Sequence, residues 1–417
     1  MTAIVGILNK HGIAVAADSA ETIGNGVKIY NKANKIFTLS KYEPVGAAVY
    51  GNATLGGLTP WDIIFKMYRR ELGKVTKMTM EEYVADFISY LGKNKYFSSS
   101  NDYQKVFNQQ ILSYFREYII INRIGNGKER PFTEDELKIL LENIKNEYVG
   151  LKQIESISEI SQEQFGVYIN ESIQIISQIL FGRGIDIKKI KSLLLEVLYL
   201  AFTREENLHS YSGVAIFGYG NQEIYPSMYR LKIYGVLCDK LKWYMEEICR
   251  VDNSNCAIVC PMAQSDVMLT ILKGIEPKLH NDIIQLMSHV LNECIKQISE
   301  KISKTDENLA NEVMNIDKQP AIQFLSTSLN GIVNESHIRP LINTIATLPK
   351  EDLAEVAENL IYLTSLMRRI TPDQESVGGP IDVALVSKGD GFIWIKRKLY
   401  FEKSLNETYF SKYLNND

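Results

Sequence analysis

The sequence predicts an α+β fold in which blocks of strands and blocks of helices follow one another along the chain. Short apolar runs typical of strands occur near the start, after residue 210, around residue 258 and near the end. Two long tracts between them, from about residue 59 to 208 and from about 265 to 370, have the apolar spacing of amphipathic helices. Strands this far apart in the chain must share sheets, which is typical of a layered α+β domain.

The first sixty residues predict four strands and the start of a helix. The polar turn Asn9–Gly12 is the right length to join the first two strands as a hairpin. We expect the helix to begin at Thr59-Pro60, because Thr caps helices and Pro suits the first helical position, and to end at Gly73. Its buried face should contain Trp61, Ile64, Tyr68 and Leu72. In order, the strands expected over the whole chain are 3–8, 13–17, 35–39, 45–49, 212–218, 227–233, 257–260, 381–386 and 392–396.

Composition excludes several classes of protein. A net charge of -4 argues against a nucleic-acid-binding protein, which needs a surplus of positive charge. No run of about 18 apolar residues predicts a membrane span, and the N-terminus does not have the pattern of a secretion signal. Five cysteines, an odd and scattered set, do not form a disulfide framework, so we expect a cytoplasmic protein.

Metal and cofactor sites are not predicted. Cys256 and Cys260 lie four residues apart in an apolar run without a matching pair, which favours buried free thiols over a metal site. The five histidines show no metal-binding spacing, and the Gly218–Gly220 segment lacks the third glycine of a dinucleotide-binding loop. We therefore expect neither a metal nor a cofactor.

Three residues in the β-rich start are candidates for chemistry. Thr2 becomes the N-terminal residue if Met1 is removed, Asp18 follows an apolar run, and Lys35 precedes an apolar pair. Each residue also has a structural interpretation: a frayed chain end for Thr2, a turn for Asp18 and protection of a strand edge for Lys35. The strand at 3–8 begins directly after Thr2, which leaves the chain end no slack.

The combination resembles the N-terminal region of proteasome β-type subunits and their bacterial relatives, which are N-terminal nucleophile hydrolases. The resemblance rests on TAIVGILNKHGIAVAADSAET, KIF and AAVYGNAT, with Thr2, Gly6, Asp18, Ser19, Lys35 and Gly51 at the family's positions. It continues in SGVAIFGYGNQEIYPSMYRLKIYGV, CAIVCPMAQSDV and DQESVGGPIDVALVSKGDGFIWI. The stretch from Asp18 to Lys35 is about one residue longer than usual, and Val377 intrudes before the closing glycine pair.

The resemblance implies a four-layer αββα sandwich of antiparallel sheets with two large helical insertions. It divides the chain into a discontinuous core at 1–58, 209–265 and 373–402, a first insertion at 59–208 that includes a core helix, a second helical region at 266–372, and a tail at 403–417.

The resemblance also implies a threonine-type peptidase. After removal of Met1 the Thr2 hydroxyl would attack a peptide carbonyl while its own amine handles the proton. Lys35, kept charged by Asp18, would favour the deprotonated forms of the hydroxyl and amine, and a backbone N–H at Gly51 would stabilise the oxyanion. Asp373 and Ser376 would orient the amine.

Two other functions are open on the sequence alone. One is a catalytically silent scaffold with the same fold, although a scaffold has no need of Thr2, Asp18 and Lys35 together. The other is hydrolysis of amide bonds in small molecules. The expected partners are a peptide or protein substrate, other copies of the chain in an oligomer or ring, and an activator or unfoldase.

Overall fold

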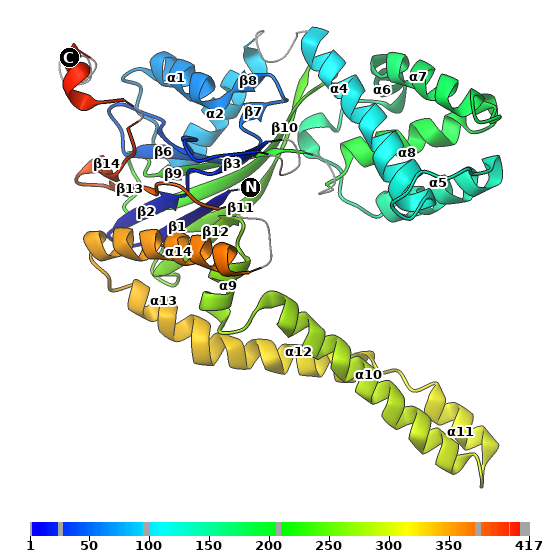
Figure 1. The fold of residues 1–417 in the computed structure, drawn as a ribbon. Helices are drawn as coiled ribbons and strands as arrows, with labels where there is room; N and C mark the ends of the chain where they lie inside the picture. Colours follow the sequence, from blue (N-terminus) through cyan, green and yellow to red (C-terminus); the bar gives the residue numbers. More distant parts are fainter. Residues whose placement is uncertain are drawn as a thin grey trace. The chain divides into compact units, whose positions relative to one another are not determined.

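The computed structural model describes residues 2–23, 28–94, 101–205, 210–371, 377–399 and 401–408 (Figure 1). It is a mixed α+β fold with antiparallel sheets and many helices, as predicted. The chain forms two compact units. Unit 1 comprises 1–33, 250–385 and 393–417, and unit 2 comprises 34–249 and 386–392.

The sheet of unit 1 has the strand order β12-β1-β2-β13-β14. β1 and β2 form the predicted hairpin, and β12 pairs with the other edge of β1, with Ala3 opposite Ala263. Every residue of β1 and β2 is buried, which explains why both strands are almost continuously apolar. The strands are β1 (Ala3–Asn9), β2 (Gly12–Ala17), β12 (Ala257–Ala263), β13 (Asp382–Ser387) and β14 (Gly391–Lys396).

Helix α14 (Lys350–Ile370) packs against β1 and β2 of this sheet (Figure 1). Its buried face contains Leu353, Ala357 and Ile361, which share a core with Ala3, Val5 and Ile7 of β1. Within the same tract α10 and α12 lie side by side. The other helices of unit 1 are α9 (Asp266–Lys273), α10 (Pro277–Ile302), α11 (Glu307–Met314), α12 (Gln319–Val333), η4 (Asn334–Ile338), α13 (Arg339–Ile345) and the short η5 (Lys403–Leu405).

The sheet of unit 2 has the strand order β11-β10-β9-β6-β5. Helices α1 (Trp61–Leu72) and α2 (Met80–Lys93) pack on one face, where Ile64 and Phe87 meet Ala47 and Val214. The predicted buried face of α1 is confirmed, and so is its end at Gly73, whose φ is 53°. The strands are β5 (Ile36–Thr38), β6 (Val45–Gly51), β9 (Ser212–Gly218), β10 (Ser227–Leu237) and β11 (Lys240–Arg250).

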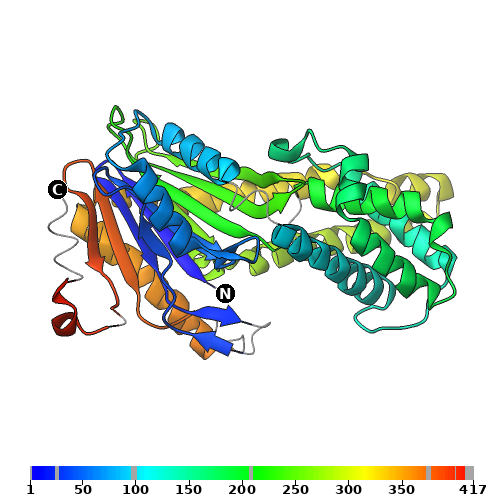
Figure 2. The same ribbon diagram turned by 90° about the horizontal axis from the view of Figure 1, so that it is seen from above.

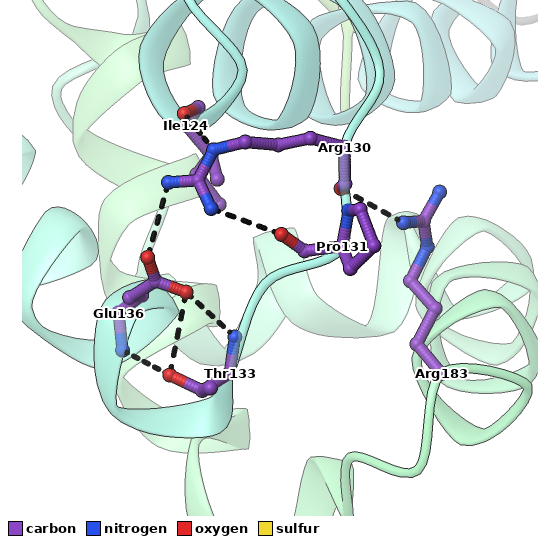
Figure 3. Close-up of polar contacts among 6 residues, drawn as sticks. All are labelled: Ile124, Arg130, Pro131, Thr133, Glu136 and Arg183. Carbon is purple, nitrogen blue, oxygen red and sulfur yellow. Dashed lines mark hydrogen bonds and ion pairs between the residues drawn. The ribbon is translucent and has the colours of Figure 1, made fainter.

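A second apolar core in unit 2 belongs to the remaining helices, which lie together as one group (Figure 2). Helix α5 begins with a capping box in which Thr133 and Glu136 bond each other's backbone N–H (Figure 3). Arg130 donates to Glu136 at 3.0 Å and so ties the preceding loop to the same cap. These helices are α4 (Asn101–Ser113), η1 (Tyr114–Ile124), α5 (Glu134–Val149), η2 (Glu155–Ile157), α6 (Gln162–Tyr168), α7 (Asn170–Phe181), η3 (Ile187–Lys189) and α8 (Lys191–Thr203).

The prediction for the start of α1 is wrong by one residue, and Thr59 does not cap the helix. Pro60 is the N-cap, and its side chain makes no capping hydrogen bond. Instead Thr59 and Pro60 form β8 (Thr59–Pro60), which pairs with β7 (Thr54–Leu55), and the Thr59 hydroxyl bonds Tyr103. The sequence analysis also missed β3 (Glu21–Ile23), β4 (Lys28–Tyr30) and the long strand β11. The predicted boundaries of core and insertions, and the stacking of two sheets into four layers, stay predictions.

Candidate active site

Thr2 directly precedes β1, an inner strand of the sheet of unit 1. Thr2 is only 8% exposed. Its carbonyl oxygen accepts a hydrogen bond of 3.1 Å from the N–H of Gln264, the residue that follows β12. Residue 3 already belongs to β1 and pairs with β12. The backbone around Thr2 is therefore fixed by the sheet from its first described residue onward, although a chain end ordinarily frays. Met1 lies outside the described residues.

Asp18 directly follows β2, opposite Ala3, and its carboxylate is buried with 1% of the residue exposed. Oδ1 accepts the Ala3 N–H at 2.9 Å. Oδ2 accepts the N–H of Ala20 at 3.1 Å and that of Gly378 at 3.2 Å. A buried carboxylate is costly unless such donors compensate it, so Asp18 is built into a specific polar niche. The Ala20 bond is the local turn contact that the structural interpretation predicted.

The residue after Asp18 ties down the segment around Gly378. Ser19 N–H donates to Gly378 O at 3.1 Å, and its hydroxyl donates to the carbonyl oxygen of Pro380. Asp18 and Ser19 thus hold this segment from both sides. The sequence analysis missed Gly378 as a partner of Asp18, because a backbone N–H has no signature in the sequence. Asp373 and Ser376, the predicted amine-orienting residues, lie outside the described residues.

Lys35 and Gly51 belong to unit 2, where neighbouring strands hold them. Lys35 comes one residue before β5, is 5% exposed, and accepts the Val49 N–H on its carbonyl oxygen at 2.8 Å. Gly51 ends β6 with a φ of 75°, and a Cβ built on it would lie 2.5 Å from the Tyr211 carbonyl oxygen. Both the backbone conformation and the close approach require glycine at position 51.

The direction of the Gly51 N–H follows from the ladder between β6 and β9. Asn52 N–H donates to Tyr211 O at 3.1 Å, so this pair is hydrogen-bonded. Because bonded and non-bonded pairs alternate in antiparallel sheets, the adjacent Gly51–Ser212 pair points its N–H groups away from one another. The Gly51 N–H is therefore directed to the side of β6 where Val49 bonds Lys35, past the first residue of β5.

The structure thus assembles two pairs. Thr2 and Asp18 meet in unit 1, and Lys35 and Gly51 lie at one strand end in unit 2. That the two pairs form one active site stays a prediction. Throughout the described ranges no cluster of three or more His, Cys, Asp or Glu side chains could hold a metal ion. None of the described helices is long and apolar enough to cross a membrane.

Comparison with known proteins identifies no family. No family model and no curated protein sequence matches the chain. Three solved structures are among those that match the chain.

The first is an Anbu Gly-1 mutant from Hyphomicrobium sp. strain MC1, with 8% sequence identity and a TM-score of 0.27. The match covers 100% of this chain and 98% of the Anbu chain. Anbu, described as an ancestral β-subunit, from Yersinia bercovieri has 9% identity, a TM-score of 0.24 and coverage of 100% and 97%. The helically assembled Anbu complex from Pseudomonas aeruginosa has 10% identity, a TM-score of 0.26 and coverage of 99% and 93%.

These matches correct the family predicted from the sequence. They are Anbu proteins, a proteasome-like but distinct family, and none is named as an N-terminal nucleophile hydrolase. The prediction that the chain is a relative of proteasome β-type subunits within that hydrolase class is therefore wrong. At TM-scores of 0.24 to 0.27 the similarity carries no argument about activity, which has to come from the residues of this chain.

Proposed function

We propose that the chain is a threonine-type hydrolase of peptide or other amide bonds, with the Thr2 hydroxyl as nucleophile once Met1 has been removed. The observation that carries the proposal is the bond from Ala3 N–H to Asp18 Oδ1, 2.9 Å long. It fixes the backbone immediately behind Thr2 to a buried carboxylate. A nucleophile at a chain end needs such restraint, since a small misplacement of the attacking atom lowers the rate strongly.

The proposed reaction uses the chain's own terminus as base. The Thr2 amine, with an ordinary pKa of about 7.7 to 8.0, takes the proton of the hydroxyl as the oxygen attacks the amide carbonyl. The carbon–nitrogen bond of the substrate breaks and the leaving amine takes that proton. Water then attacks the acyl–Thr2 ester, releases the carboxylic acid and restores the hydroxyl.

Lys35 and Gly51 supply the electrostatics in this proposal. The Lys35 ammonium favours the developing alkoxide of Thr2, and the Gly51 N–H donates to the oxyanion, an interaction worth about 3 kcal/mol. The two groups share one strand end of unit 2, as the Val49–Lys35 bond indicates. The proposal requires that the sheets of the two units stack as a four-layer sandwich, which would bring this strand end to Thr2.

A scaffold without activity is the second candidate. The hydrogen bonds of Asp18 favour it as well, because the same three N–H groups need an acceptor whether or not Thr2 reacts. Self-association is proposed for either function, and the Anbu complex of Pseudomonas aeruginosa is described as a helical assembly. We also propose that the chain acts in the cytoplasm, which the five free cysteines support.

The decisive experiment tests whether the bond between Met1 and Thr2 is cleaved and whether Thr2 then reacts. Intact mass of the purified chain reports whether Met1 is absent, and an electrophile that reacts with N-terminal threonine should then form one adduct, mapped to Thr2. Thr2→Ala should abolish both the adduct and hydrolysis of a mixed peptide library, whereas Thr2→Ser should retain part of each. Thr270→Ala, at a half-buried position of α9, is the matched control. Retained Met1, or an unmodified Thr2 in a folded chain, would refute the hydrolase and leave the scaffold.

A further inference from the structure

Helix α10 is a long helix with little cover. Of its 26 residues, all of which the structure describes, only Ser299 is buried, and its hydroxyl donates to the Ala310 carbonyl oxygen of α11 at 2.8 Å. On the same side of the helix Ile284, Leu291 and Ile295 are half-buried, and α10 contacts both α11 and α12. Helices in proteins owe most of their stability to the packing of an apolar face. Much of α10 is left without such packing by the part of the chain that the structure describes.

A second apolar face of α10 is exposed. Leu286 is 63% exposed, and Leu279 and Ile298 are each 50% exposed. Spacings of mostly three and four residues place the apolar side chains of this face along one side of the helix. This exposed stripe consists of Leu279, Ile283, Leu286, Met287, Val290, Cys294 and Ile298. It leaves roughly 500 Å² of apolar surface in water, and a continuous patch of that size marks an interaction site on a soluble protein.

The exposed stripe has the same spacing in both chain directions. Its outermost members, Leu279 and Ile298, are equidistant from the midpoint between residues 288 and 289. Met287 and Val290 are also equidistant from this midpoint. In a contact between identical surfaces about a twofold axis, residue i meets residue j and residue j meets residue i. Two copies of α10 placed antiparallel, with the midpoint on the axis, therefore bring apolar side chains together along the whole stripe.

A row of charged residues beside the stripe has the same symmetry. Lys278 and Glu300 are equidistant from His289 in the sequence, and all three are exposed. Asp282 and Lys296 are also equidistant from His289 and exposed. In an antiparallel pair the same flank of each helix faces the other, so Lys278 meets Glu300 of the second copy. Asp282 likewise meets Lys296 of the second copy. A parallel pair would place identical charges at the same height, so the charges favour the antiparallel arrangement.

We propose that α10 is a homodimer interface, in which it docks antiparallel on α10 of a second copy of the chain, with His289 near the twofold axis. The pair buries roughly 1,000 Å² of apolar surface, and the flanking polar residues bring the total to the roughly 1,200–2,000 Å² of a stable interface. This inference rests on the self-association proposed above, for which it specifies the surface, and it does not depend on hydrolysis by Thr2.

Charge exchange on the full-length chain tests the pairing. Sedimentation equilibrium measures the dissociation constant of the wild-type dimer at about pH 8, where an ordinary histidine is neutral. Asp282→Lys and Lys296→Glu should each raise this constant about tenfold or more, because each variant brings like charges together twice per dimer. The double variant should return to within about threefold of the wild type. The two positions lie about 21 Å apart along one helix, so only a contact between copies can produce this rescue.

Leu286→Asp tests the apolar stripe. The side chain is exposed in the single chain, so circular dichroism should be unchanged, while the dissociation constant of the dimer should rise about 100-fold or more. Glu355→Lys, a charge reversal at an exposed position of α14, is the control and should dimerise as the wild type does.

Three results would overturn the proposal. A wild-type chain that stays monomeric at every concentration would contradict both the α10 interface and self-association. A dimer that Leu286→Asp leaves intact would exclude α10 as its interface, and so would two charge variants without rescue in the double variant. Thr2→Ala should dimerise as the wild type does, so the fate of this interface is separate from that of the proposed hydrolase.

Discussion

The N–H of Ala3 donates a hydrogen bond of 2.9 Å to Oδ1 of Asp18. In return the N–H of Asp18 donates to the Ala3 carbonyl oxygen at 3.2 Å. The two residues therefore close the open end of the β1–β2 hairpin, with one bond from the backbone and one through the carboxylate. Together with the Gly378 bond this connects the start of the chain to a segment near its end.

Asp18→Ala should lower the free energy of unfolding by about 3 kcal/mol or more, because two buried N–H groups and one half-buried N–H group lose their acceptor. Urea unfolding followed by fluorescence measures the effect. Asp252→Ala is the control, since Asp252 accepts the N–H groups of Ser254 and Asn255 at an exposed turn. The control should change stability by at most about 1 kcal/mol. Equal losses in the two variants would contradict a special role for the buried niche.

Gly51→Ala should destabilise the chain by about 1–3 kcal/mol, because alanine is strained at a φ of 75° and its Cβ would meet the Tyr211 carbonyl. Gly92→Ala in α2 is the matched control. A Cβ there meets nothing within 4 Å, so this variant should be neutral or gain up to about 1 kcal/mol of helix stability. Thermal unfolding of the three proteins compares them directly.

Lys242→Met should stabilise the protein most at low pH. The folded pKa of about 7 lies below the unfolded value of about 10.4, so unfolding takes up a proton between these values. The wild type therefore gains stability as pH rises from 7 to 10, and below pH 7 it carries the full cost of the buried charge. That cost is on the order of 4 kcal/mol at 1.36 kcal/mol per pKa unit.

Urea unfolding of the wild type and Lys242→Met at pH 6, 8 and 10 checks this prediction. The difference between the two proteins should shrink with rising pH. Lys232→Met should instead be destabilised at pH 6 and 8, because Oε1 of Glu246 loses the ammonium that lies 3.1 Å from it. A pH-independent difference for Lys242→Met would show that its amine does not titrate in this range.

Lys35→Met separates the proposed chemistry from folding. In the hydrolase this variant should lose about 100-fold or more in kcat, because the hydroxyl loses its electrostatic activation. Methionine keeps the length of the side chain, and circular dichroism checks that the variant is folded under the assay conditions, so the loss in kcat is measured apart from any change in stability. Lys10→Met, on the exposed hairpin turn, should leave kcat unchanged. Unaltered turnover in Lys35→Met would remove Lys35 from the mechanism.

Much of the fold could be predicted from the sequence at strands that are buried on both faces. β1 and β2 are almost continuously apolar and every one of their residues is buried, and their hairpin turn is visible in the chain. Asp18 stands out as a carboxylate directly after such a run. These signals are local, so they can be recognised without knowledge of the tertiary structure.

The missed features depend on contacts between distant segments. β11 was not predicted because its sequence KLKWYMEEICR mixes charged and apolar residues, and its two glutamates pair with Arg230 and Lys232 on the next strand. Thr59 looked like a helix cap, but its hydroxyl bonds Tyr103. The role of Gly378 at Asp18 rests on a main-chain N–H, which every residue except proline possesses.

The strand order of unit 1 has a consequence for how the protein is made. Of the described strands, β1 comes first in the sequence and is an inner strand of its sheet, and Asn9 pairs with Ala257, which is synthesised much later. Until then β1 has only β2 beside it, and a lone hairpin is marginal in water. The Gly378 donor to Asp18 emerges later still. The environment of Thr2 can therefore be completed only after residue 378 has been translated, so a chain truncated before that residue cannot form it.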